Sequence, residues 1–285
     1  MLFEINDSDN INRILRYYDR TESRIGYQYL LHGTKHFGYY EQGQSRWQFT
    51  AAMRRMEREL GKRLALPTDA SVLDAGCGMG DVARTMATKY GLKVTGIDIL
   101  DFNIAEARKR STKQGLTDCT TFQLGDYHKL DFPDESFDGV YTMETLVHAS
   151  DPGKVLSEFW RVLRPGGRLV LFEYSRTPEK QLRPAANQAL QRVCDLGAMP
   201  TWFRMNHGDL AKLLAESGFS SVSEEDVTEH MLPMLHAFYL IGRFPYFVGR
   251  TIDRVPKVVN AMSGVEMYRY REAWRYNIFA ANKPR

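Results

Sequence analysis

The stretch VLDAGCGMGD at residues 72–81 constrains the fold more than any other part of the chain. Gly76, Gly78 and Gly80 follow a short apolar run, and a helical pattern begins directly after them. Because glycine has no Cβ, a glycine-rich backbone turns tightly and lets a ligand approach closely. We therefore expect a strand, a ligand-binding turn and a helix in that order. A plain tight turn would use the same residues, so the neighbouring segments must decide between the two.

Short apolar or β-branched runs alternate with helical patterns from residue 71 onward. The predicted strands are SVLDA, KVTGIDI, TTFQLG, FDGVYTM and GRLVLFEY, and EAWRYNIFAANK is a last strand. The helical segments between them include GDVARTMATKYG, NIAEARKRSTKQG and DPGKVLSEFWRVLRPGG. This repetition predicts an α/β fold with a doubly wound, mostly parallel sheet.

The alternation also predicts how the chain is divided. Residues 1–64 read as an N-terminal helical cap, and residues 65–285 as the domain that contains the sheet. Two stretches, about 175–206 and about 229–271, interrupt the strands and are expected to be helical insertions. The second is rich in Met, Phe, Tyr and Pro. We expect both to form a lid over a substrate, although side chains of this kind would equally cover an apolar sheet edge.

The spacing of polar residues narrows the class of ligand. The glycines follow GxGxG, which differs from the GxGxxG of dinucleotide folds, and no Gly-Lys-Ser/Thr closes a phosphate-binding loop. Asp98 ends the second predicted strand, where an acidic residue binds ribose hydroxyls in nucleotide-binding folds. Asp126 follows the third predicted strand and could accept a hydrogen bond from an adenine amino group, or could simply cap a turn. The pattern favours a nucleoside without phosphates.

Four motifs, VLDAGCGMGD, VTGIDI, LGDYHKLDFPDESFDGVYTMETLVH and FWRVLRPGGRLVLFEY, follow one another over about residues 65–180. In order and interval they resemble the motifs of class I S-adenosylmethionine-dependent methyltransferases. HFGYYEQGQS and METLVHASDPGKV resemble, more narrowly, the branch of sterol, tocopherol and bacterial terpenoid methyltransferases. Sterol enzymes carry a more aromatic, glycine-rich run where this chain has YYEQGQSRWQF. The resemblance implies a Rossmann-like class I methyltransferase fold, S-adenosylmethionine as cofactor and S-adenosylhomocysteine as product. Methyl transfer from a sulfonium is an in-line displacement that requires no metal, so we expect none.

The resemblance also implies a role for individual residues. It assigns the cofactor contacts as follows: Asp74, Gly76 and Gly78 at the methionine moiety, Asp98 at the ribose, Ile99, Asp126 and Tyr127 at the adenine, Met143 near the sulfonium, and Tyr39 as a cover from the N-terminal segment.

The catalytic candidates follow from the chemistry. Methyl transfer needs near-attack geometry and a base that removes a proton from a hydroxyl, an amine or an alkene-derived cation. Glu144 and His148 follow the fourth predicted strand and are four positions apart, so we expect them on one face of a helix, as base and orienting partner. Glu173, with Tyr174, is a second candidate pair. Packing, capping and local hydrogen bonds would also account for each of them.

These observations predict a methyltransferase that acts on a hydrophobic small molecule. The expected reaction is C-methylation of an isoprenoid or terpenoid-bearing natural product, and the alternative is O- or N-methylation of a natural-product or quinone-like acceptor. A nicotinamide-dependent oxidoreductase is disfavoured by the glycine spacing. A catalytically silent cofactor-binding subunit is disfavoured by the presence of Glu144 and His148.

Charge and composition limit the classes of partner and the cellular location that we expect for this protein. With 38 basic and 35 acidic residues the net charge is only +3, so we expect no nucleic-acid partner. We find no apolar run of about 18 residues that would span a membrane, no signal peptide and no CxxC pair among the three cysteines, which predicts a cytoplasmic protein. The segment GRFPYFVGRTIDRVPKVV predicts at most a weak membrane-surface contact. Exposed aromatics on the N-terminal helices would suit a homo-oligomer.

Overall fold

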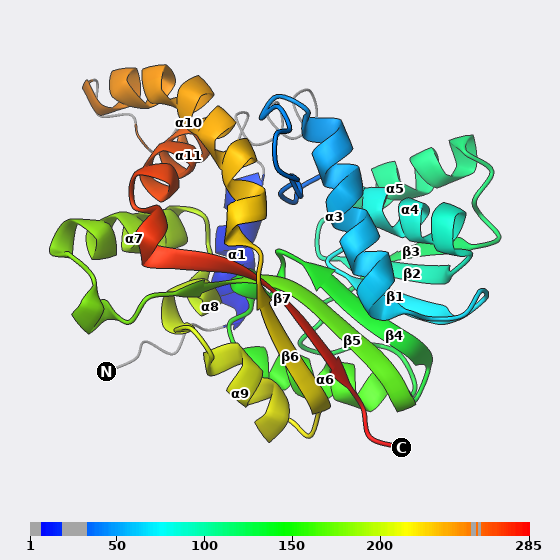
Figure 1. Ribbon diagram of the computed structural model, residues 1–285. Coiled ribbons are helices and arrows are strands. Elements are labelled where there is room, and N and C mark those ends of the chain that lie inside the picture. The colour runs from blue at the N-terminus through cyan, green and yellow to red at the C-terminus, as the bar shows by residue number, and fades with distance from the viewer. Residues whose placement is uncertain (1–6, 19–32, 252–254, 256–257) are drawn as a thin grey trace.

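A seven-stranded sheet forms the centre of the structure (Figure 1). The computed structural model describes residues 7–18, 33–251, 255 and 258–285. Its strands are β1 (Ser71–Ala75), β2 (Lys93–Asp98), β3 (Thr120–Leu124), β4 (Phe137–Met143), β5 (Leu163–Arg176), β6 (Ser220–Asp226) and β7 (Trp274–Asn282). They are arranged in the order β3-β2-β1-β4-β5-β7-β6, and only β7 runs antiparallel to its neighbours. The doubly wound, mostly parallel sheet predicted from the sequence is confirmed.

The strand order fixes where a ligand can bind. β1 lies between β2 and β4, and Leu73 is in register with Thr95 on one side and Val140 on the other. The chain winds outward from β1 in one direction and from β4 in the other. In such sheets the ligand crevice lies beyond the carboxyl ends of the strands at this switch point. In this chain the glycine turn follows β1, and residues 144–148 follow β4.

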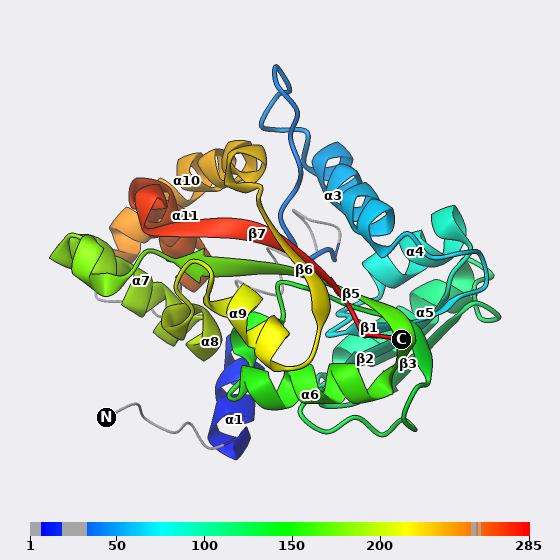
Figure 2. The same cartoon turned by 60° about the horizontal axis from the view of Figure 1, so that its bottom comes forward.

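Helices cover both faces of the sheet (Figures 1 and 2). One face carries α3 (Phe49–Leu64), α4 (Asp81–Tyr90) and α5 (Asp101–Lys113), and the other carries α6 (Pro152–Val162) and α9 (Asp209–Glu216). Met56, Leu60 and Met86 are fully buried on the first face, whereas Phe159 and Leu214 are fully buried on the second. The sheet is therefore buried on both sides, which explains why its strands read as continuous apolar runs.

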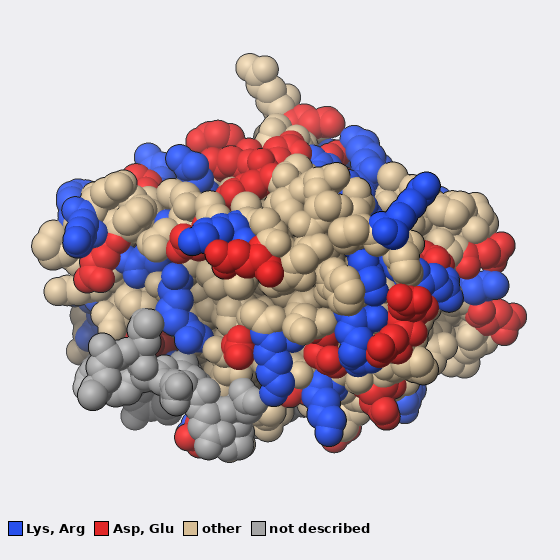
Figure 3. Space-filling model, turned by 90° about the horizontal axis from the view of Figure 1, so that it is seen from below, with Lys and Arg blue, Asp and Glu red and all other residues tan. Residues whose placement is uncertain are grey.

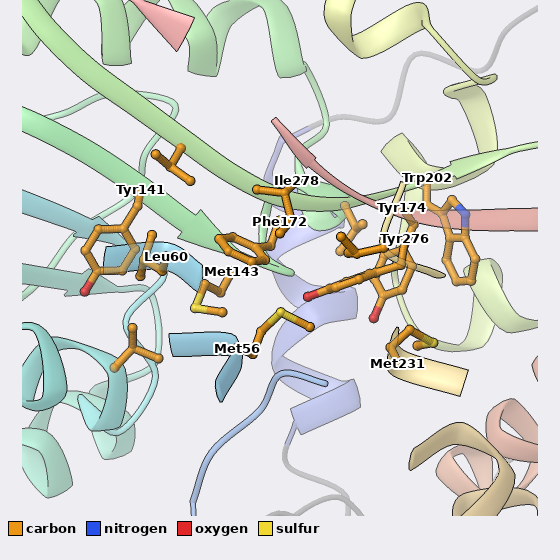
Figure 4. Packing of buried hydrophobic residues seen from close by; sticks show 14 of the residues in the cluster. Met56, Leu60, Tyr141, Met143, Phe172, Tyr174, Trp202, Met231, Tyr276 and Ile278 are labelled. Carbon is orange, nitrogen blue, oxygen red and sulfur yellow. The ribbon is translucent and has the colours of Figure 1, made fainter. Parts of the chain in front are cut away.

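A second group of helices gathers at one end of the sheet (Figure 1). It comprises α1 (Asp7–Tyr18), α7 (Pro184–Leu196), α8 (Pro200–Arg204), α10 (Thr228–Thr251) and α11 (Val259–Arg269). The predicted insertions supply α7 and α8 from the first and α10 and α11 from the second. Figure 4 shows how they join the core: Trp202 of α8 stacks on Tyr174 of β5 with ring centroids 4.6 Å apart, beside Tyr276 of β7. Between α1 and α3, residues 33–48 contain no helix.

The surface carries charges of both signs. Figure 3 shows Lys and Arg interspersed with Asp and Glu over the face that it presents, without a continuous basic stripe on that face. Within the described ranges, no helix is both long and apolar enough to cross a bilayer.

Candidate functional site

The glycine turn after β1 has the left-handed backbone that its sequence predicts. Gly76 has φ +92° and Gly80 has φ +73°, values that side chains other than glycine rarely adopt. A Cβ on Gly76 would lie 2.6 Å from Thr145 Cγ2, and one on Gly80 would lie 2.7 Å from the Phe122 ring. Both glycines are therefore required by backbone conformation and by close packing. The turn is held against the loop that follows β4.

A first cavity of about 100 Å³ lies beside this turn. Every cofactor residue predicted from the sequence lines it except Tyr39: Asp74, Gly76, Gly78, Asp98, Ile99, Asp126, Tyr127 and Met143. The candidate catalytic residues Glu144 and His148 also line this cavity. Residues that are far apart in the chain thus meet at the switch point of the sheet.

Carboxylates dominate the polar lining of the first cavity. The carboxylate of Asp98 accepts hydrogen bonds from the amides of Gly78 and Leu100, each at 2.9 Å. Asp126 accepts from the amide of His128 at 2.9 Å, and its pKa is lowered chiefly by hydrogen bonds from that residue, which outweigh the opposing effect of burial. Burial raises the pKa of Asp74 to about 7. Acceptors placed in this way suit the hydroxyl, amino and ammonium donors of an aminoacyl nucleoside.

A second, larger cavity of about 390 Å³ adjoins the first. Its walls are mainly apolar and aromatic and include Tyr17, Phe37, Tyr174, Met199, Trp202, Leu235, Phe238 and Met267. Five residues line both cavities: Tyr18, Lys35, His36, Glu144 and His148. We call this set the junction. The second cavity is suited to a hydrophobic molecule, one part of which would reach the junction.

His148 is buried at the junction and is held in one tautomer. Its Nδ1 lies 2.7 Å from the carbonyl oxygen of Ala198, which can only accept, so Nδ1 carries the proton. Its Nε2 lies 3.1 Å from the Tyr18 hydroxyl and accepts from it. Burial lowers the pKa of His148 to about 4. The imidazole is therefore neutral near pH 7 and is a weak base.

Glu144 has an unusual backbone and a fully engaged side chain. Its φ is +60°, and it precedes a short 3₁₀ turn, Leu146–His148, rather than an α-helix. The expectation that Glu144 and His148 share one helix face is therefore wrong, because the chain turns sharply between β4 and this 3₁₀ turn. Glu144 lies before the 3₁₀ turn and His148 at its end, and both line the junction.

The carboxylate of Glu144 accepts from three donors. They are the amide of Phe37 at 2.6 Å, the hydroxyl of Tyr276 at 2.8 Å and the hydroxyl of Tyr174. Burial raises the pKa of Glu144, and these donors oppose that rise. Met143 and the two tyrosines that hold this carboxylate are seen together in Figure 4. The carboxylate is thus fixed in position beside the end of β4.

Glu173 lines neither cavity. The Oε1 atom of its carboxyl group accepts from the amides of Thr145 at 3.1 Å and Leu146 at 2.7 Å, and from the Thr142 hydroxyl at 3.3 Å. Burial raises the pKa of Glu173 to about 8. In this position the side chain holds the turn that carries Glu144, so the structure gives it the place of a positioning residue rather than of a base in contact with substrate.

Tyr39 does not reach the first cavity, which corrects its expected role. Its ring stacks on His230 of α10 at 4.0 Å, and its amide bonds to the carbonyl of Ala52 in α3. These contacts direct the side chain away from the glycine turn. Lys35 and His36, a few residues earlier, occupy the place instead. Neither residue was predicted from the sequence, where their one distinguishing feature is their position directly before the aromatic run FGYY.

The fold and the site together define a class I α/β enzyme with an acidic nucleoside pocket beside an apolar cavity. The profile of the family described as "Methyltransferase domain" matches residues 73–171. The S-adenosyl-L-methionine-dependent Diels-Alderase iccD of Talaromyces variabilis is 36% identical over 277 residues, which cover 95% of this chain and 94% of that protein. The sterol 24-C-methyltransferase ERG6B of Gibberella zeae is 32% identical over 221 residues, or 77% of this chain and 57% of that protein.

A solved structure supports the fold. The geranyl diphosphate C-methyltransferase of Streptomyces coelicolor superposes with a TM-score of 0.74 over 98% of this chain and 99% of that one, at 17% identity. The chain belongs to the S-adenosylmethionine-dependent methyltransferase family. It is an enzyme of that family, and its cofactor is S-adenosylmethionine. The fold class and the cofactor predicted from the sequence are both confirmed.

Proposed function

We propose that the protein methylates a carbon atom of a hydrophobic, isoprenoid- or terpenoid-bearing small molecule. The observation that carries this proposal is the junction, where an apolar cavity of about 390 Å³ meets the acidic nucleoside pocket. A sterol 24-C-methyltransferase is among the relatives, and its name gives a sterol as the substrate and carbon as the methylated atom. The helical insertions at 175–206 and 229–271 serve as the lid, because α8, α10 and α11 supply walls of the second cavity. Residues 1–64, of which the structure describes 7–18 and 33–64, act as the N-terminal cap.

The cofactor fits the first cavity by its donor groups. Asp98 would hold the ribose hydroxyls, and Asp126 would accept from the adenine amino group. Ile99 and Tyr127 would pack beside the base. The methionine moiety would lie along Asp74, Gly76 and Gly78, which places Met143 and the junction near the sulfonium. When bound, the cofactor supplies an electrophilic methyl group at the end that faces the second cavity.

The weak basicity of His148 favours a carbon acceptor over a hydroxyl or amine acceptor. In methylation at carbon, an alkene carbon bonds to the methyl group, the carbon–sulfur bond breaks, and the resulting cation loses an adjacent proton. Such a proton is highly acidic, so the weakly basic Nε2 of His148 is sufficient to take it once the Tyr18 hydroxyl, which donates to Nε2 in the structure, turns away. A hydroxyl acceptor would require a stronger base. O- or N-methylation is therefore the less favoured alternative.

Charge and aromatic faces at the junction would stabilise a cation. The fixed carboxylate of Glu144 lies beside the end of β4, and the rings of Phe37, Tyr174 and Trp202 line the second cavity. The Tyr18 ring already carries the Lys35 ammonium, 4.4 Å from its centroid. A cation over an aromatic face gains about 0.5–2 kcal/mol per ring. Glu144 thus acts as a counter-charge that is held in place before the acceptor binds, rather than as a mobile base.

The test is product analysis by mass spectrometry with a panel of prenylated and terpenoid acceptors. C-methylation gives a product that is heavier by one methylene unit and releases one S-adenosylhomocysteine for each product. NMR then locates a new C–CH₃ group. An O- or N-methyl product instead establishes the alternative. If a sample that binds the cofactor forms neither a methylated product nor S-adenosylhomocysteine, methyl transfer to those acceptors is excluded.

A cycloaddition is a second candidate, and one observation favours it. The match to the Diels-Alderase iccD extends over 95% of this chain and so includes the lid, whereas the match to the sterol enzyme covers 77%. A [4+2] cycloaddition transfers no proton, so a neutral His148 and a fully bonded Glu144 would suit it. Its product has the same mass as the substrate, and the cofactor is not consumed. The assay above therefore separates the two reactions.

A further inference from the structure

The second half of α10 presents an apolar face to solvent. Phe244 is 73% exposed, Phe247 65%, Ile241 44% and Val248 38%. These residues repeat at helical spacing over residues 241–251, so they lie on neighbouring positions of one surface. Figure 1 shows this part of α10 at the outer edge of the molecule, away from the sheet. We call these four residues the α10 patch.

The orientation of the α10 patch is fixed by the opposite face of the helix. Gly242, Tyr246 and Gly249 are buried. A Cβ on Gly242 would lie 2.9 Å from the carbonyl oxygen of Ala261 in α11, and the Tyr246 hydroxyl donates to the buried carboxylate of Glu266. The helix is therefore pressed against α11, and the two phenylalanines cannot turn inward without breaking this contact.

Within the described residues 241–251 of α10, every charged side chain is basic. Arg243 and Arg250 are exposed, and residues 241–251 contain no acidic side chain. Glu266, the acid that faces this helix from α11, is buried and bonded to Tyr246. A helix with large apolar side chains on its outer face, flanked by arginines, is typical of binding to an anionic membrane surface.

The α10 patch is continuous with the second cavity. Ile241 belongs to the patch and also lines the cavity, together with Gly242 and Pro245. We propose that the α10 patch docks on an anionic lipid bilayer, so that a hydrophobic acceptor passes from the bilayer into the second cavity without crossing water. The delivery step rests on the proposed function, whereas the docking itself does not.

A second copy of the chain fits the α10 patch less well. Two copies that pair through this patch about a twofold axis would bring the arginines of one copy close to those of the other, and like charges repel. Eleven helical residues are about 16 Å long, which is short for an interface that needs about 800 Å² from each partner. An anionic surface, by contrast, satisfies the arginines and buries the phenylalanines together.

The test is co-sedimentation with phosphatidylcholine vesicles, with and without phosphatidylserine. F244E/F247E removes the apolar contact, and we expect its partition onto either kind of vesicle to fall at least about tenfold. R243Q/R250Q removes the charges, and each substitution should lower binding to phosphatidylserine vesicles about fivefold while leaving binding to phosphatidylcholine unchanged. W47E is the matched control, because Trp47 is 54% exposed and lies outside the α10 patch. It should bind both kinds of vesicle as the parent protein does.

Titration with S-adenosylhomocysteine shows that each variant is folded, and sedimentation velocity gives its oligomeric state. Docking is overturned if the parent protein ignores both kinds of vesicle, or if F244E/F247E binds them as well as the parent does. A parent dimer that F244E/F247E converts to a monomer would assign the patch to a second copy and overturn the proposal. Vesicle binding is measured without acceptor, so a failure of the proposed methyl transfer leaves this result unaffected.

Discussion

Asp98→Ala removes a carboxylate that organises the glycine turn and faces the cofactor. In the structure this carboxylate accepts from the amides of Gly78 and Leu100, both at 2.9 Å. Each hydrogen bond to a charged group is worth about 1.5–3 kcal/mol. In the alanine variant the amides of Gly78 and Leu100 and the ribose hydroxyls lose the carboxylate that accepts from them. Water can take the place of the carboxylate, because the turn is partly exposed. We therefore expect the binding free energy of S-adenosylhomocysteine to weaken by about 2–3 kcal/mol, or about 30- to 150-fold in Kd.

Calorimetric titration with S-adenosylhomocysteine measures this change directly and requires no acceptor. Asp98→Asn should lie between the parent and the alanine variant, since the amide keeps one acceptor oxygen but turns a donor toward a backbone amide. Asp101→Ala is the matched control, because Asp101 is exposed in the first turn of α5 and lines neither cavity. If Asp98→Ala binds as the parent protein does, with an unchanged melting temperature, the ribose assignment is refuted.

Other substitutions probe the junction and the turn. His148→Ala should spare S-adenosylhomocysteine affinity and lower turnover, and a loss of affinity would show that its role is assigned wrongly. The pKa of His148 is about 4 in the folded protein and 6.5 as its ordinary value, so the unfolded state binds more protons between these pH values. Urea unfolding should show that stability falls by about 3 kcal/mol from pH 6.5 to 4 relative to His148→Gln, and parallel curves would contradict this. Glu144→Gln should bind S-adenosylhomocysteine normally but lower turnover by about 10²–10³-fold, and activity close to that of the parent would exclude a counter-charge role. Gly76→Ala should lower the free energy of unfolding by about 3 kcal/mol, because it adds a left-handed strain and a clash with Thr145. Gly43→Ala is the control, because Gly43 has φ +82° and no heavy atom lies within 4 Å of the added Cβ. If denaturant titrations show the same loss of unfolding free energy for both variants, the clash with Thr145 contributes nothing.

The cofactor side of the site could be predicted because its residues are local to the strand ends. In a parallel sheet the residues at or next to the carboxyl end of each strand lie on the same edge, so Asp74, Asp98 and Asp126 had to converge once the strands were recognised. The glycines that follow Asp74 adopt a left-handed backbone that glycine favours, so their identity alone predicts the tight turn. The strand pattern and the turn pattern thus determined most of the first cavity before any tertiary contact was known.

The acceptor side could not be predicted in the same way, because it depends on contacts between distant segments. The family resemblance placed Tyr39 at the cofactor, but its ring stacks on His230 of α10. No local sequence pattern predicts this contact. Spacing suggested that Glu144 and His148 share a helix, but φ +60° at Glu144 replaces that helix with a sharp turn. That conformation is held by Glu173, whose carboxylate binds the amides of the turn.

The two candidate reactions share most of what the site provides. Both require an apolar cavity that excludes water, and neither requires a strong base, which agrees with the lowered pKa of His148. What separates them is the position of the reacting carbon. Methyl transfer needs it beside Met143 and Glu144, at the inner end of the second cavity, whereas a cycloaddition can occur anywhere within the aromatic walls. Enlarging a wall of the second cavity outside the junction, as in Phe238→Ala, should therefore disturb a cycloaddition more than methyl transfer, whereas Glu144→Gln should do the reverse.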